Sequence, residues 1–281
     1  MEKDIQLIDI DKIIARSNSK ILKKLPSFLI SYLKRIAHQN EINDFLIKHS
    51  SNYGIDFINA AIEDTNVSYT IQGLENIPKN GRYIFVANHP LGGFDGMVLY
   101  KTVFENFGDA KFISNNILLN IKNLSEIFAG VNTTGSSSRQ EIVNLENIFS
   151  SNMQVLIFPA GLVSRKHKGV IKDLEWKKTF VTKAIQHERE VVPIYISGNL
   201  SNFFYRLSNI RKFFKIKSNI EMLYLADETF RFRDHSFTLT FGKPISYKTF
   251  SKEYSHQNWA MKIREHIYKI PQGHNEFIVT T

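Results

Sequence analysis

The segment at residues 86–100, VANHPLGGFDGMVLY, places a histidine and an aspartate six positions apart, with a proline and two glycines between them. A carboxylate beside an imidazole accepts the proton of one ring nitrogen, which leaves the other nitrogen free to take a proton from a substrate. His89 and Asp95 are therefore candidates for a general base and its partner. The same residues also fit a purely structural interpretation, in which Asp95 caps the helix that follows the turn.

A second segment, FPAGLVSRK at residues 158–166, also follows an apolar run and then turns through a proline and a glycine. It ends in a hydroxyl and two cations, and the planar fork of an arginine suits a phosphate or a carboxylate. One loop with a base and one loop with cations predict a single cleft for an anionic substrate. The residues of interest are Phe158, Pro159, Gly161, Ser164, Arg165 and Lys166.

Both segments need a rigid scaffold, and the pattern of the chain predicts one. Apolar or alternating runs indicate strands at 67–73, 83–88, 110–116, 153–161, 189–198 and 236–246. Helical patterns lie between them at 96–108, 138–152 and 174–188. This alternation predicts an α/β fold with a largely parallel sheet flanked by helices. Asn88 and His89 directly follow the second strand, and such sheets bind ligands at the carboxyl ends of their strands.

Three parts of the chain are expected: a helical extension at 1–66, the α/β domain at 67–247, and a helix with a tail at 248–281. In the first part, apolar residues between Leu25 and Ile36 recur at helical spacing among lysines. Such a stripe is typical of a surface helix packed on a core, and also of a helix that lies in a membrane interface.

Composition narrows the choice of partners. The 281 residues carry a net charge of +9, which favours an anionic partner, and no cysteine, which excludes disulfides and thiolate metal sites. No apolar stretch reaches about 18 residues and no secretory signal is found, so we expect a cytoplasmic protein, peripheral on the inner face of the cytoplasmic membrane. Nothing in the sequence indicates an oligomeric state.

The segment 202–217, NFFYRLSNIRKFFKIK, interleaves aromatic and basic residues. Three interpretations fit it: a membrane-interfacial patch, a core helix with solvated lysines, or a site for single-stranded nucleic acid. We prefer the first, and expect membrane lipid rather than nucleic acid as a partner.

The order of the motifs, NH-x5-D, then FP-x-G with SR, then VVP-x-Y, resembles the lysophospholipid acyltransferase superfamily of the glycerol-phosphate acyltransferase type, from about residue 70 to 247. The resemblance implies that family's fold and an O-acyltransferase activity. In the family, the histidine of an H-x4-D motif deprotonates a hydroxyl of the acceptor. That hydroxyl attacks the thioester of acyl-CoA or of acyl carrier protein, which is the co-substrate. The resemblance implies no bound cofactor and no metal ion. His89 would be the base, and Asp95 would orient it.

The resemblance also implies the residues that surround the substrate. FPAGLVSR corresponds to the family's FPEGTRS, which grips the phosphate of the acceptor. GVNTTGSSSR at 130–139 stands where the family commonly has a hydrophobic–Asp–Arg element; it would bind an anion or simply cap the next helix. The expected substrate-binding residues are Asn88, Gly92, Gly93, Phe158, Pro159, Gly161, Ser164, Arg165, Lys166, Arg139 and Thr134.

Two departures from the family bear on activity and substrate. The spacing from His89 to Asp95 is one residue longer than in H-x4-D, so their contact requires a non-helical turn, which Pro90 and the glycines permit. Ala160 replaces the glutamate of FPEG. HPLGGFDG and FPAGLVSR are more similar to the branch that acts on amino-acid-linked lipids, alongside hemolysin-like acyltransferases. The expected acceptor is a lyso-amino-acid lipid such as an N-acyl glycine lipid, or lysophosphatidic acid.

The same departures motivate an alternative, a catalytically silent membrane-binding protein on the same fold. Other enzyme classes are disfavoured, because the chain has no G-x-S-x-G, P-loop or H-E-x-x-H motif. His89 and Asp95 lack a recognisable third ligand, so no metal site is expected.

Overall fold

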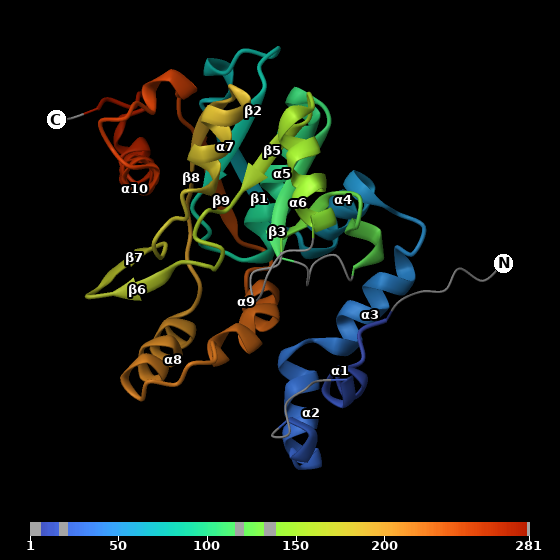
Figure 1. Ribbon diagram of the computed structural model, residues 1–281. Helices are drawn as coiled ribbons and strands as arrows, with labels where there is room; N and C mark the ends of the chain where they lie inside the picture. Colours follow the sequence, from blue (N-terminus) through green and yellow to red (C-terminus); the bar gives the residue numbers. More distant parts are fainter. Residues whose placement is uncertain (1–6, 17–21, 116–120, 132–138, 280–281) are drawn as a thin grey trace.

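The computed structural model describes residues 7–16, 22–115, 121–131 and 139–279. Within these residues, seven strands form one sheet in the spatial order β1 (Ser68–Gln72), β9 (Ser236–Phe241), β8 (Glu190–Ile196), β2 (Tyr83–Ala87), β5 (Gln154–Ile157), β3 (Ala110–Asn115) and β4 (Phe128–Val131) (Figure 1). Every neighbouring pair is parallel except β8 and β9. The expected fold class, a largely parallel sheet flanked by helices, is therefore confirmed.

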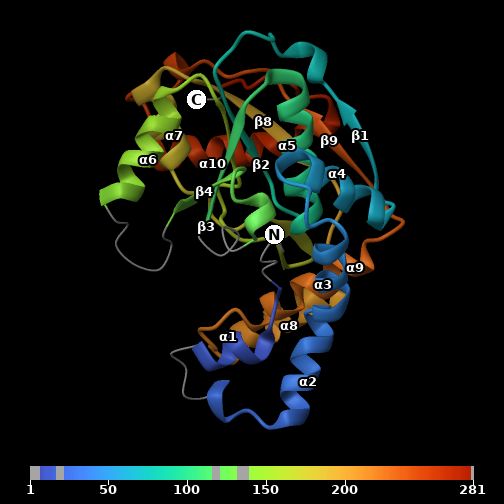
Figure 2. The same ribbon diagram turned by 90° about the vertical axis from the view of Figure 1, so that its right-hand side faces the viewer.

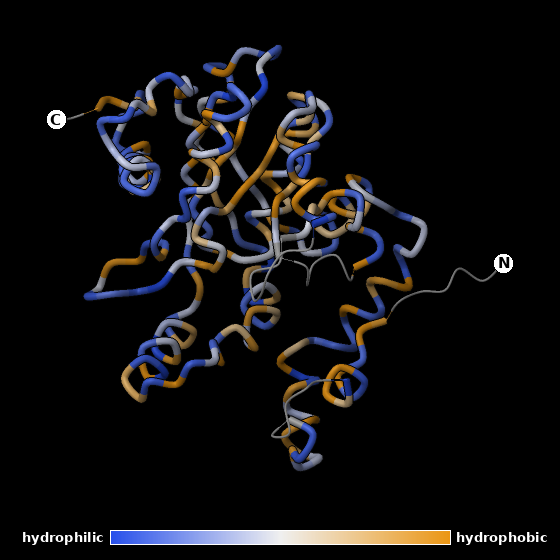
Figure 3. The backbone as a smooth tube through the Cα atoms, viewed as in Figure 1, coloured by the Kyte–Doolittle hydropathy of each residue, from blue (hydrophilic) through white to orange (hydrophobic). Residues whose placement is uncertain are grey.

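The central strand β2 shows why both faces of the sheet are covered. All of its residues are buried and apolar, as expected for a parallel strand with helices on two sides. Alternate side chains enter two separate cores: Tyr83, Phe85 and Ala87 pack in one, and Ile84 and Val86 pack in the other. Figure 3 shows the contrast between the hydrophobic central strands and the mixed character of the outer helices.

Helices supply the other half of each core (Figures 1 and 2). The first core contains side chains of α4 (Gly54–Thr65) and α5 (Gly93–Phe107). The second contains side chains of α6 (Arg139–Ser150), α7 (Thr179–His187) and α10 (His256–Ile267). α5 begins at Gly93, earlier than the start expected near Met97, so Asp95 lies in its first turn.

A helical lobe, residues 10–16, 22–48 and 202–231, lies beside the lower edge of the sheet in Figure 1. It consists of α1 (Ile10–Arg16), α2 (Ser27–Ile36), α3 (Gln39–Lys48), α8 (Asn202–Phe213), the 3-10 helix η5 (Ile220–Tyr224) and α9 (Leu225–Arg231). Its two segments pack together: the hydroxyls of Tyr32 and Tyr224 are 2.7 Å apart, and His38 stacks on Phe230 with ring centroids 4.0 Å apart. Among the described residues, every helix is too short or too polar to cross a membrane.

Among the described strands and α-helices, four are not predicted by the sequence pattern: β4, α9, and the two strands of a hairpin, β6 (Arg165–His167) and β7 (Val170–Lys172). They are short, and the hairpin is rich in charged residues, so neither a helical nor an alternating apolar period is visible in them. The hairpin directly follows the FPAGLVS segment and therefore belongs to the surroundings of the candidate site.

Candidate active site

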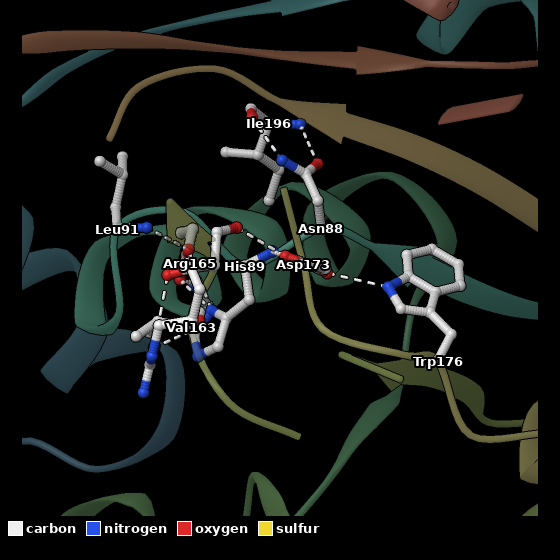
Figure 4. A network of polar contacts seen from close by, with 11 residues as sticks. Asn88, His89, Leu91, Val163, Arg165, Asp173, Trp176 and Ile196 are labelled. Carbon is white, nitrogen blue, oxygen red and sulfur yellow. Dashed lines mark hydrogen bonds and ion pairs between the residues drawn. The ribbon is translucent and has the colours of Figure 1, made fainter. Parts of the chain in front are cut away.

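The side chains of His89 and Asp95 meet at the start of α5 (Figure 4). Nδ1 of His89 lies 3.0 Å from each of the two carboxylate oxygens of Asp95. The intervening chain is a non-helical turn, in which Gly92 takes a positive φ of 79° that suits glycine. The contact required for a general base is therefore present, although the spacing is one residue longer than in H-x4-D.

Asp95 is placed to hold a negative charge. Its side chain is fully buried, and its carboxylate accepts the backbone N–H groups of Leu91 and Gly96, both at 2.8 Å. These donors lie at the N-terminus of α5, where the helix dipole favours an anion. Because an ionised carboxylate can only accept, Nδ1 of a neutral His89 carries the proton and Nε2 is the acceptor nitrogen.

The imidazole of His89 stays accessible on one side. The relative exposure of its side chain is 17%, and no described residue forms a hydrogen bond with Nε2. The ring stacks on Phe158, with centroids 3.9 Å apart and planes 15° apart, which fixes its orientation. This arrangement can take a proton from a group that approaches Nε2.

The loop that carries Phe158 forms a tight turn next to His89. Gly161 donates its N–H to the carbonyl of Phe158 at 2.9 Å and has a φ of 68°, and the carbonyl of Pro159 accepts the N–H of Lys177. Ala160 is buried in the second core. The methyl group of Ala160 fits these apolar surroundings, where a carboxylate would need a partner to offset its burial.

The structure does not support the interpretation of Arg165 as an anion grip. Its guanidinium is buried and forms an ion pair with Glu221, with Nη2 and Oε1 2.9 Å apart. Nη1 donates to the carbonyls of Val163 and Ser164, and the group lies over the ring of Phe204. Since Glu221 and the backbone already occupy this arginine, it is not open to a substrate phosphate.

Two further residues expected to bind substrate are occupied by hydrogen bonds within the protein (Figure 4). The side chain of Asn88 donates to the carbonyl of Ile196 at 2.8 Å and accepts its N–H at 2.7 Å, which joins the end of β2 to β8. The hydroxyl of Ser164 is buried and donates to Asp173 at 2.6 Å. Both residues hold the scaffold of the site instead of facing a ligand.

Gly92 allows the close approach of α9, whereas a side chain at Gly93 would make only an ordinary contact with that helix. A Cβ on Gly92 would lie 2.8 Å from the side chain of Leu225, and a Cβ on Gly93 would lie 3.5 Å from that of Thr229. Close approach of this helix therefore explains Gly92 better than contact with substrate does.

The remaining expected positions make no hydrogen bond or ion pair with His89 or Asp95 that the described part of the chain shows. Lys166 is half-buried, and its Nζ is 3.3 Å from Oδ1 of Asn202 on α8. Arg139 is exposed at the first residue of α6, whereas Thr134 lies outside the described residues. The segment VVPIYI, expected as a substrate wall or a buried strand, is the buried strand β8.

Sequence reasoning missed two acids that organise the site, Asp173 and Glu221. Asp173 accepts the backbone N–H of His89 at 3.1 Å, and burial raises the pKa of its carboxyl. Each acid contacts residues more than fifty positions away, and neither belongs to a recognisable motif. In the described ranges, no three His, Asp or Glu side chains meet as a metal site would require.

Comparison with known proteins agrees with this geometry. A family model described as Acyltransferase matches residues 12–273. The chain is 45% identical over 265 residues to the lyso-glycine lipid O-acyltransferase of Bacteroides thetaiotaomicron, a match that covers 94% of this chain and 97% of that protein. It is 45% identical over 270 residues to the protein of the same name from Phocaeicola vulgatus, covering 96% and 97%.

A more distant likeness is to the crystal structure of the 1-acyl-sn-glycerophosphate acyltransferase PlsC from Thermotoga maritima. It covers 96% of this chain and 89% of that one, at 18% identity and a TM-score of 0.45, which is too distant to bear on the substrate. The family match spans nearly the whole chain and agrees with the resemblance inferred from the motifs. The chain therefore belongs to the acyltransferase family and is an acyltransferase enzyme.

Proposed function

We propose that this enzyme moves a fatty acyl group from an acyl thioester to the hydroxyl of a lyso-glycine lipid at a membrane surface. The observation that carries the proposal is the buried carboxylate of Asp95 on Nδ1 of His89, which leaves Nε2 open as a base. The two relatives at 45% identity are named for the same acceptor.

The reaction uses His89 twice. Nε2 takes the hydroxyl proton as the acceptor oxygen bonds to the thioester carbonyl carbon, and it returns that proton to the sulfur when the carbon–sulfur bond breaks. Between these events the carboxylate of Asp95, 3.0 Å from Nδ1, stabilises the imidazolium. A positioned base of this kind contributes about 10²- to 10⁴-fold in rate.

The donor is an acyl carrier protein or coenzyme A thioester, which acts as a co-substrate rather than a bound cofactor. Both carriers are anionic, and the net charge of +9 favours their approach. These thioesters are made inside the cell, so the reaction takes place on the inner face of the cytoplasmic membrane.

Two features of the site support the choice of a glycine lipid rather than a lysophosphatidic acid as the proposed acceptor. The arginine that would grip a phosphate is paired with Glu221 and buried, and the glutamate of FPEG is replaced by Ala160. An arginine pairs with phosphate and carboxylate alike, but a phosphate with up to two charges needs such a cation more than the singly charged carboxylate of a glycine lipid does.

Access to a lipid acceptor comes from the helical lobe. An interfacial patch on α8 and the residues after it exposes apolar side chains: Phe203, Ile210, Phe213, Phe214 and Ile216. Exposed cations stand among them: Arg206, Lys212, Lys215 and Lys217. On α2, in the same lobe, the side chain of Phe28 is also exposed. Aromatic side chains in the head-group layer and cations on anionic lipid are typical of peripheral membrane contact.

The test compares the wild type with His89→Ala on vesicles that contain lyso-glycine lipid, with acyl-CoA and the acyl thioester of acyl carrier protein as alternative donors. Mass spectrometry should show the diacylated product for the wild type and at least about 10²-fold less for the variant, with unchanged vesicle binding. His274→Ala, which alters an exposed histidine near the C-terminal end, serves as the matched control.

A wild type that binds vesicles but forms no product with either donor would instead indicate a silent membrane-binding protein. A wild type that acylates lysophosphatidic acid as well as the glycine lipid would contradict the assigned acceptor. In cells without the gene, lipid mass spectrometry should show loss of the diacylated glycine lipid and accumulation of its lyso form.

A further inference from the structure

The base is held from its backbone side by an acid far away in the sequence. We propose that Asp173, together with Ser164, is the positioning residue of His89 and fixes its backbone through a closed ring of hydrogen bonds, a role whose catalytic meaning rests on the acyl transfer proposed above. Asp95 fixes the imidazole, whereas Asp173 fixes the point from which the imidazole projects.

The ring joins three residues from separate segments (Figure 4). The N–H of His89 donates to Oδ1 of Asp173 at 3.1 Å, and the hydroxyl of Ser164 donates to the same oxygen at 2.6 Å. The N–H of Ser164 donates to the carbonyl of His89 at 2.8 Å and closes the ring. Both backbone groups of His89 are thus bonded to one unit.

The end of β2 explains why such a ring is needed. Pairing of β2 with β8 stops at Ala87, and its pairing with β5 stops at Val86, so the next backbone groups have no strand partners. Backbone groups in a protein interior need partners. Asn88 supplies one connection through the backbone of Ile196, and Asp173 supplies the next at His89. Side chains therefore continue the hydrogen bonding of the sheet to the base itself.

Hydrogen bonds fix the side chain, the N–H and the carbonyl of Asp173. Its Oδ2 accepts Nε1–H of Trp176 at 2.9 Å, its N–H donates to the hydroxyl of Tyr268 at 2.7 Å, and its carbonyl accepts a hydrogen bond from Arg264. The side chains of Asp173 and Trp176 are buried. A displacement of about 1 Å at a catalytic group costs about 10²-fold in rate, so this anchoring matters for turnover.

The activity test uses Asp173→Asn, Trp176→Phe and the double variant. An asparagine keeps one acceptor oxygen, but its NH₂ group must then face a donor. That donor is either the indole N–H of Trp176 or the two groups that donate to Oδ1 in the wild type, the N–H of His89 and the hydroxyl of Ser164. We expect kcat of Asp173→Asn to fall about 10²-fold, with KM for the acceptor within about two-fold. In the double variant, phenylalanine lacks the indole N–H, so the NH₂ group can occupy that side and the amide oxygen can accept from His89. The kcat should therefore be at least about ten-fold higher than in Asp173→Asn alone.

Asp64→Asn is the matched control, because Asp64 is a partly exposed acid paired with Lys48; it should keep wild-type constants. An unchanged kcat in Asp173→Asn, a loss in KM alone, or no recovery in the double variant would each overturn the proposed role. All constants are measured below the unfolding temperature of each variant, so that loss of folded protein does not enter kcat.

Hydrogen exchange tests the ring independently of the proposed function. In Asp173→Ala the amide of His89 loses its acceptor, and its exchange should become at least about ten-fold faster while residues 84–87 stay protected. Unchanged exchange at His89 in the folded variant would overturn the positioning role, whatever the activity. Faster exchange in a protein without acyl transfer activity would leave the ring in place and reject only the proposed function.

Discussion

The ion pair between Arg165 and Glu221 leads to a quantitative prediction for the free energy of unfolding and for the KM of the acceptor. Glu221 is fully buried and lies between two guanidiniums: 2.9 Å from Nη2 of Arg165 and 2.8 Å from Nε of Arg211. Glu221→Ala would leave Arg165 charged, buried and without a counter-charge. Breaking a buried pair in this way costs about 3 to 5 kcal/mol in the free energy of unfolding.

Removing both charges together should have a much smaller effect. In Arg165→Met with Glu221→Leu, no buried charge is left unpaired at these positions, and apolar replacements of buried ion pairs are often neutral. Arg211 keeps some exposure and a hydrogen bond to the carbonyl of Ile216, so it can remain charged. We therefore expect the double variant to lie within about 1 kcal/mol of the wild type.

Urea denaturation measures the stability of the three proteins, and KM for lyso-glycine lipid measures acceptor binding. If Arg165 is structural, KM in the double variant stays within about two-fold of the wild type. A rise of about ten-fold or more, which corresponds to about 1.4 kcal/mol, would show that Arg165 reaches the acceptor. A loss below about 1 kcal/mol in Glu221→Ala would show that the pair is not buried as described.

Two further predictions concern the membrane and pH. Phe213→Ser with Phe214→Ser should weaken binding to anionic vesicles about ten-fold or more, because two exposed rings lose their burial in lipid; Ile142→Ser, an exposed apolar residue on α6, should not. Burial lowers the pKa of His266 from 6.5 to about 4. Between these values the unfolded chain binds a proton that the folded chain excludes, so the free energy of unfolding falls as the pH falls. His266→Phe should lose less stability than the wild type between pH 7 and pH 4.5, as measured by urea denaturation; equal losses would contradict the assignment.

The sheet and the contact between His89 and Asp95 could be predicted from the sequence because their signals are local. β2, β5 and β8 are short apolar runs, and their neighbours in the chain carry helical periods. His89 and Asp95 are six residues apart, and the glycines between them permit the turn that their contact requires. All of this information lies within a few residues of each feature.

The support of the site could not be predicted, because it depends on long-range pairs. His89 and Asp173 are 84 positions apart, and Arg165 and Glu221 are 56 positions apart. A charged residue next to a motif suggests a ligand contact when its protein partner is unknown, which is why Arg165 was interpreted as an anion grip. Only the folded chain shows that a second charge already occupies it.

This division separates the reaction from the choice of acceptor. Three hydrogen-bonding groups of His89, its N–H, its carbonyl and Nδ1–H, are held by Asp173, Ser164 and Asp95, so Nε2 is left for the reacting hydroxyl. In the proposed reaction, the local motif therefore provides for proton transfer, independently of the acceptor. Under the proposed function, the choice of acceptor depends on the neighbouring cation, because the ion pair with Glu221 keeps Arg165 away from any substrate anion. If the proposed acceptor is correct, Glu221, which no motif contains, bears on substrate choice through Arg165, and the KM of the Arg165→Met, Glu221→Leu variant tests that link directly.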